Sequence, residues 1–123
     1  MSAGIALDES TFDEFVRSAD RPVLIDFWAT WCGPCKVLDP VLEDVAREDD
    51  RFILVSVDSD ANPSLGQRFG VMSVPTIVLV RDGAVVWQST GSRGRTRLEE
   101  DLDRAFGYRL ADRRRTQSDV PRS

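Results

Sequence analysis

The chain has 123 residues, of which 41% are hydrophobic and 30% charged, a composition that predicts one globular domain with its own core. The net charge of −5 argues against nucleic acid or an anionic membrane surface as the main partner, because basic faces bind both. The absence of histidine excludes Cys–His catalysis, Ser–His–Asp triads and most zinc sites.

The first half of the chain predicts strands that alternate with helices. Residues 4–7 predict a weak strand, and a helix follows that Ser10 is placed to cap and Arg21-Pro22 to end, with an apolar face made of Phe12, Phe15 and Val16. Residues 23–28 are almost continuously apolar, as in a strand buried on both faces, and Asp26 is their one charged residue. Next comes a helix with Pro40 inside it and an apolar side of Val37, Leu38, Val41, Leu42 and Val45.

The second half ends in a hairpin and a helix. Residues 51–57 predict a buried strand, and a short helix with the apolar residues Leu65, Phe69 and Val71 follows it. Asp82-Gly83 predicts a hairpin between strands at 76–80 and 84–87. A last helix has the apolar stripe Leu98, Leu102 and Phe106, and Gly107 ends it. This order predicts an α/β fold in which helices flank both faces of a central mixed β-sheet.

The end of the chain differs in composition. Residues 108–123 carry five arginines against two aspartates and few apolar side chains. We expect a domain at 1–107 followed by a polar, arginine-rich, flexible C-terminal tail. The alternative is a basic arm that contacts an acidic partner.

The beginning of the chain shows neither the basic nor the apolar region of a signal peptide, and no apolar run approaches the about 20 residues that cross a bilayer. We therefore expect a cytoplasmic protein without a membrane partner, in a compartment that keeps thiols reduced. Its two cysteines, Cys32 and Cys35, lie three residues apart. In such a compartment a pair of this kind is more often catalytic or metal-binding than structural.

The two cysteines flank Gly33-Pro34 at the point where the buried strand turns into a helix. The unpaired N–H groups and the positive dipole at a helix start stabilise a thiolate, and Pro34 fits the first turn because it needs no N–H partner there. We expect Cys32 to be the more exposed cysteine and to attack a disulfide, and Cys35 to be shielded and to resolve the mixed disulfide. A zinc site shared by two chains and a purely structural disulfide are the alternatives.

Residues 27–36 resemble the active-site segment of the thioredoxin family almost residue for residue, and the resemblance extends over about residues 4–107 through Pro40, Val74-Pro75-Thr76, Gly83 and Gly91. It implies the thioredoxin fold and a monomeric protein-disulfide reductase with a redox-active disulfide and no bound cofactor or metal. Electrons would come from NADPH through a flavin-containing thioredoxin reductase and pass to disulfide-containing target proteins.

The resemblance also implies roles for individual residues. Asp26 would be a buried acid beneath the cysteines whose raised pKa suits it to exchange a proton with Cys35; the alternative is an acid at a strand edge that faces water. Pro75 would be cis and abut the cysteines. The substrate surface would be lined by Trp31, Val74 and Gly91.

Two features leave alternatives open. Trp28 fits either support of the site or plain core. By register, Ser56 stands where the family often has a lysine near the buried acid, so that desolvation alone would raise the pKa of Asp26.

Two other functions compete with the reductase. One is a thioredoxin-like disulfide oxidase or isomerase, against which Gly33-Pro34 and the lack of an export signal count. The other is a non-catalytic binding subunit or chaperone of the same fold, against which the intact cysteine pair counts.

Overall fold

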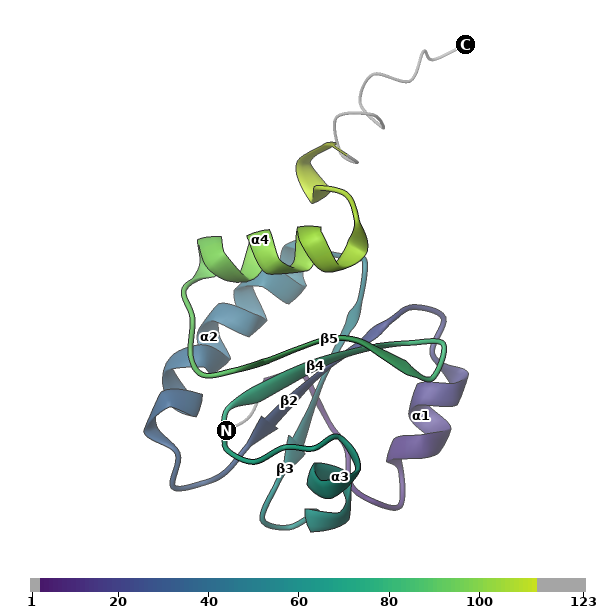
Figure 1. Ribbon diagram of the computed structural model, residues 1–123, viewed down its shortest axis with the longest axis vertical. Coiled ribbons are helices and arrows are strands. Elements are labelled where there is room, and N and C mark those ends of the chain that lie inside the picture. Colours follow the sequence, from purple (N-terminus) through teal and green to yellow (C-terminus); the bar gives the residue numbers. More distant parts are fainter. Residues whose placement is uncertain (1–2, 113–123) are drawn as a thin grey trace.

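Figure 1 shows the computed structural model, in which residues 3–112 are described. The elements follow one another in the predicted order: β1 (Ile5–Ala6), α1 (Phe12–Ser18), β2 (Val23–Trp28), α2 (Gly33–Glu48), β3 (Ile53–Asp58), α3 (Pro63–Arg68), β4 (Thr76–Arg81), β5 (Ala84–Thr90) and α4 (Arg95–Phe106). No helix within the described part of the chain is both long and apolar enough to cross a membrane.

The strands form one mixed sheet in the order β1-β3-β2-β4-β5. β3 lies between β1 and β2 and is parallel to both, while β4 runs antiparallel to β2 and to β5. Strand β2 is therefore central, paired on both edges, and its residues up to Phe27 are buried. The predicted α/β fold with a central mixed sheet is confirmed.

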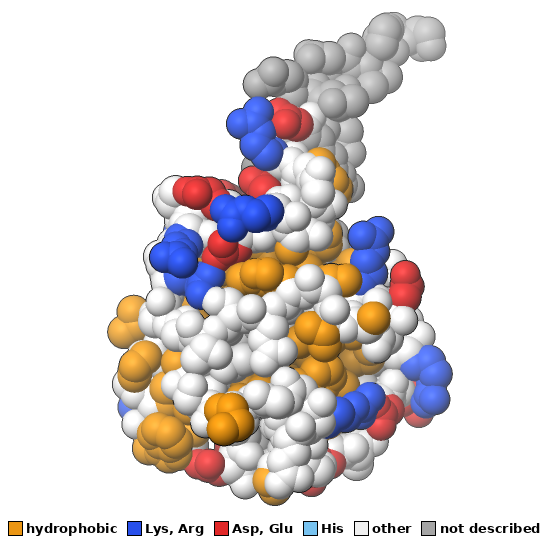
Figure 2. Space-filling model, in the orientation of Figure 1, with side chains coloured by type: hydrophobic (Ala, Val, Ile, Leu, Met, Phe, Trp, Pro, Cys, Tyr) orange, Lys and Arg blue, Asp and Glu red, His pale blue; other side chains and the backbone are white. Residues whose placement is uncertain are grey.

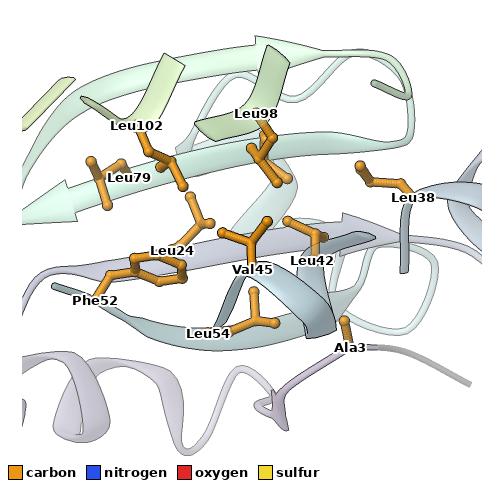
Figure 3. Close-up of a cluster of buried hydrophobic side chains, with 11 residues drawn as sticks. Ala3, Leu24, Leu38, Leu42, Val45, Phe52, Leu54, Leu79, Leu98 and Leu102 are labelled. Atoms are coloured by element: carbon orange, nitrogen blue, oxygen red, sulfur yellow. The ribbon is translucent and has the colours of Figure 1, made fainter. Parts of the chain in front are cut away.

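Helices cover both faces of this sheet, α2 and α4 on one side and α1 and α3 on the other (Figure 1). Side chains alternate along a strand, so β2 sends Leu24 into one core and Ile25 and Phe27 into the other. Figure 3 shows the first core, in which Leu42 of α2 and Leu98 of α4 converge on side chains from the sheet.

The start of α1 differs from the prediction for Ser10. Thr11 occupies the cap position and makes no side-chain cap bond. The Asp8 carboxylate instead accepts hydrogen bonds from the backbone N–H groups of Ser10 and Thr11, at 2.8 and 3.0 Å. Asp8 can do this because a short carboxylate readily reaches the N–H groups two and three residues on.

The apolar side of α2 is narrower than predicted. Leu38, Leu42 and Val45 are buried, but Val37 is 66% exposed and Val41 only packs against the edge of the core. A helix advances about 100° per residue, so Val37 and Leu38 cannot both point to the centre of one contact face. The helix continues through Pro40 to Glu48.

The hairpin between β4 and β5 turns at Asp82 and Gly83, as predicted, with φ values of +52° and +79°. A turn with two left-handed residues suits a two-residue hairpin, and glycine adopts this conformation without a Cβ penalty. A Cβ at Gly83 would meet no atom within 4 Å, so any effect of adding one is conformational.

We therefore expect Gly83→Ala to lower the free energy of unfolding by about 1 kcal/mol, and Gly83→Asn to lower it less, because asparagine tolerates the left-handed region. Urea denaturation of the three proteins measures this order. Equal stability of the alanine variant and the original chain would contradict it.

The first residues of the predicted tail lie against the domain. Arg51, which precedes β3 and is buried, donates to both carboxylate oxygens of Asp49, to Asp103 of α4 and to the carbonyl oxygen of Tyr108. Asp103 in turn accepts a hydrogen bond from the backbone N–H of Leu110 at 3.1 Å. The rest of the predicted tail, residues 113–123, lies outside the described residues.

Candidate active site

The two cysteines lie where β2 gives way to α2, joined by a disulfide with their Cα atoms 5.3 Å apart. Cys32 is the N-cap of α2, and its Sγ accepts a hydrogen bond from the backbone N–H of Cys35 at 3.1 Å. Gly33 and Pro34 form the exposed first positions of the helix, where proline leaves no N–H without a partner. The sulfur of Cys32 is thus held at the positive end of the longest helix.

The two cysteines are covered to the same extent, since each is 2% exposed. The prediction that Cys32 is the more exposed of the two was therefore wrong for this disulfide state. Ala29, Trp28 and Val74 pack around the pair and shield both sulfurs together. What distinguishes Cys32 here is its place at the helix terminus rather than its exposure.

A loop from the other side of the sheet meets the cysteines. The Val74–Pro75 peptide bond is cis, as the resemblance implies, and Pro75 is buried. Its carbonyl oxygen accepts a hydrogen bond from the backbone N–H of Gly91 at 2.9 Å, which ties the end of β5 to this loop. Gly91 has φ of +100°, a conformation that favours glycine.

Two large apolar side chains in the segments that flank the site, Trp31 and Met72, are exposed. Trp31 is 69% exposed, and its indole Nε1 donates to Asp60 Oδ2 at 2.8 Å, which fixes the ring across the loop after β3. Met72, two residues before the half-buried Val74, is 95% exposed. Trp28 is half-buried against the cysteine cluster, so it lies at the site rather than in either large core. Figure 2 shows hydrophobic side chains gathered at the lower left, where α2 begins in Figure 1.

Asp26 is fully buried, which excludes the strand-edge alternative. Its register partners are Ser56 of β3 and Ile77 of β4. Neither carboxylate oxygen has a hydrogen-bond partner among residues 3–112. Burial, and next the neighbouring carboxyl of Asp39, raises the pKa of Asp26 to about 8.

Sequence reasoning missed three residues of this region: Asp39, Asp60 and Met72. A signal for Asp39 was present, because it lies four residues after Cys35 and thus on the same side of α2. Asp60 reaches Trp31 because the loop after β3 meets the start of α2 only in the folded chain. Met72 is exposed two residues before Val74, which packs against the cysteines. Among the described residues, no group of three or more cysteine, aspartate or glutamate side chains is arranged to hold a metal ion.

A cysteine pair that forms a disulfide at a helix start, packed against the loop that carries a cis-proline, defines a thiol–disulfide oxidoreductase. The thioredoxin family model matches residues 4–104. The chain therefore belongs to the thioredoxin family.

Curated relatives agree with this assignment. A thioredoxin of Mycolicibacterium smegmatis is 44% identical over 108 residues, covering 85% of this chain and 96% of the relative. A thioredoxin of Staphylococcus haemolyticus is 42% identical over 101 residues, covering 81% and 95%. A bifunctional thioredoxin reductase/thioredoxin of Mycobacterium leprae is 40% identical over 104 residues, covering 82% of this chain and 23% of that protein. Family and cysteine pair together support a protein-disulfide reductase.

Proposed function

We propose that the chain reduces disulfide bonds in other proteins by dithiol–disulfide exchange, with Cys32 as the attacking cysteine. The observation that carries this is the position of Cys32 Sγ, which caps α2 and accepts the N–H of Cys35. After reduction, the same N–H and the helix dipole would stabilise a thiolate on Cys32. This thiolate attacks one sulfur of the substrate disulfide, forms a mixed disulfide and expels the other substrate sulfur as a thiolate.

Cys35 completes the cycle. It loses its proton and attacks Cys32 Sγ, so that the Cys32–Cys35 bond forms, the mixed disulfide breaks and the second substrate sulfur leaves as a thiolate. The substrate gains two electrons and the protein loses two. Asp26, buried on the strand beneath, accepts the proton of Cys35.

The substrate binds across the loop around the cis-proline. Exposed Trp31 supplies an apolar contact. The hydrogen bond from the backbone N–H of Gly91 to the carbonyl oxygen of Pro75 holds the cis-proline loop against the end of β5. The backbone of Val74 is placed to pair with an extended substrate segment, as in β-strand addition. Trp28 supports the cysteine pair from the side.

The partners follow from the same reaction. Disulfide-containing proteins receive the electrons, and a thioredoxin reductase restores the dithiol with electrons from NADPH. The relative from M. leprae, whose name joins the two activities in one protein, supports this pairing. We further propose a cytoplasmic monomer whose domain spans residues 1–107, with residues 108–123 as an arginine-rich tail.

The reduction potential of the Cys32–Cys35 couple tests the direction of electron flow. The reference value for thioredoxins is about −270 mV, whereas disulfide isomerases and oxidases lie near −180 and −120 mV. We expect a value close to the first, measured by tryptophan fluorescence in dithiol redox buffers. A value between −180 and −120 mV would instead assign the chain to the oxidases or isomerases.

A further inference from the structure

Asp26 has a second carboxyl beside it that the proposed reaction does not use. Asp26 shares its strand face with Leu24, which lies two residues earlier and packs against Leu38 and Leu42 of α2 (Figure 3). Its side chain therefore points toward α2. Asp39, which directly follows Leu38, is the acid that α2 presents to it.

The position of Asp39 connects the interior to the surface. It lies one helical turn after Cys35 and is half-buried, whereas Asp26 is fully buried. Asp39 Oδ1 is shielded from solvent and, like both oxygens of Asp26, has no hydrogen-bond partner in the described part of the chain. Three carboxyl oxygens without partners thus lie together between β2 and α2.

Two neighbouring carboxylates in a medium of low polarity cannot both remain ionised, because each charge lacks hydration and repels the other. A proton held between them removes one charge and supplies a donor where only acceptors exist. We propose that Asp26 and Asp39 form an acid pair that shares one proton, and that Asp39 is the partner through which Asp26 exchanges protons with solvent. Asp39 is a positioning residue, because it acts through Asp26 and not on the sulfurs.

The charges around the two carboxyl groups agree with the different roles proposed for Asp26 and Asp39. Burial and then the interaction with Asp39 raise the pKa of Asp26, while burial raises that of Asp39 and the interaction with Asp26 lowers it. Glu43, one turn further along α2, raises the pKa of Asp39, and the amino-terminal charge of the chain lowers it. Asp26 is therefore the member that holds the proton when the pair is singly protonated.

This inference rests on the proposed function for its consequence. When the shared proton moves to Asp39, Asp26 becomes a carboxylate and can accept the proton of Cys35. The Cys35 thiolate then attacks Cys32 Sγ, the pair is left doubly protonated, and half-buried Asp39 releases one proton to water. Asp26 can thus act as a base below its own pKa, without the lysine that Ser56 replaces.

Carboxyl ¹³C NMR titration of the oxidised protein tests the shared proton independently of activity. Since the two sites interact, we expect the Asp26 signal of the original chain to follow two steps, one at each pKa of the pair. In Asp39→Asn and Asp39→Ala we expect the Asp26 signal to follow a single step. Its midpoint should lie about one pH unit below the upper step of the original chain, because the neighbouring negative charge is gone. Asp44→Asn is the matched control, because it removes the same charge from α2 at a residue that pairs with Arg47.

The pH dependence of mixed-disulfide resolution is the second readout. In the original chain and in Asp44→Asn we expect its midpoint at the lower of the two steps of the pair, because the singly protonated pair already acts as the base. In both Asp39 variants we expect the midpoint to move to higher pH, to the single step of Asp26. An Asp26 midpoint that is the same with and without Asp39 would overturn the acid pair. If the pair titrates as expected and resolution does not follow it, the shared proton stands and the proposed role of Asp26 in proton transfer fails.

Discussion

Replacing Cys35 with serine is expected to turn a catalyst into a trap that holds one substrate molecule. Cys32 can still attack a disulfide, but no second thiol is left to release the product. The variant should accumulate a mixed disulfide on Cys32 that non-reducing electrophoresis and mass spectrometry detect and dithiothreitol reverses. Its multiple-turnover rate should fall by about 1,000-fold or more, which corresponds to about 4 kcal/mol or more in activation free energy.

The companion variant Cys32→Ser tests which cysteine attacks. Because both cysteines are equally covered in the disulfide form, exposure does not decide this, and the assignment depends on the helix terminus at Cys32. We expect Cys32→Ser to lose turnover to the same extent and to form no adduct, and the double variant to behave likewise. An adduct that forms on Cys35 in Cys32→Ser would contradict the assignment.

The second large effect concerns the stability of the oxidised protein against pH. Asp26 has a pKa of about 8 in the folded chain, whereas an aspartate in the unfolded chain has its ordinary pKa of about 3.8. Between these values the folded state holds a proton that the unfolded state has lost, so unfolding releases a proton and becomes easier as the pH rises. We expect the free energy of unfolding to fall by about 1.4 kcal/mol per pH unit, on the order of 4 kcal/mol from about pH 5 to 8.

Asp26→Asn should remove most of this slope, because the amide does not titrate. The buried amide can donate one N–H to Asp39, but its other polar atoms lack partners, which costs about 1–3 kcal/mol at every pH. The variant should therefore be less stable than the original chain near pH 5 and more stable near pH 8, so that the two curves cross. Urea denaturation without reductant, carried out across this pH range, measures the free energy of unfolding of both proteins. The curve of unfolding free energy against pH for Asp44→Asn should run parallel to that of the original chain. A parallel curve for Asp26→Asn as well would refute the raised pKa of Asp26.

Features that depend on neighbours in sequence were predictable. The order of strands and helices follows from apolar periodicity, which each segment carries by itself. The turn at Asp82-Gly83 follows from the backbone freedom of those two residues. The placement of the cysteines at a helix start follows from a buried strand that runs directly into Gly33-Pro34. These are local preferences, and the fold did not override them.

Two details at the edges of elements were not predictable in this way. Ser10 does not cap α1, because its hydroxyl and its backbone N–H both donate to the Asp8 carboxylate in the loop before the helix, and loop geometry decides this. Val37 looked like core because it is apolar. It is exposed because only the direction in which the rest of the chain lies determines which side of α2 is covered.

At the site itself, the sequence determined the chemistry, and the tertiary structure decided the environment. The pair Cys32 and Cys35 and the unusual charge of Asp26 could be identified from the chain alone. That both sulfurs are equally covered, and that Asp39 lies beside Asp26, depends on packing between β2, α2 and the loop before β4. Burial and the distance between charges arise only when distant segments meet, and these two quantities set a pKa.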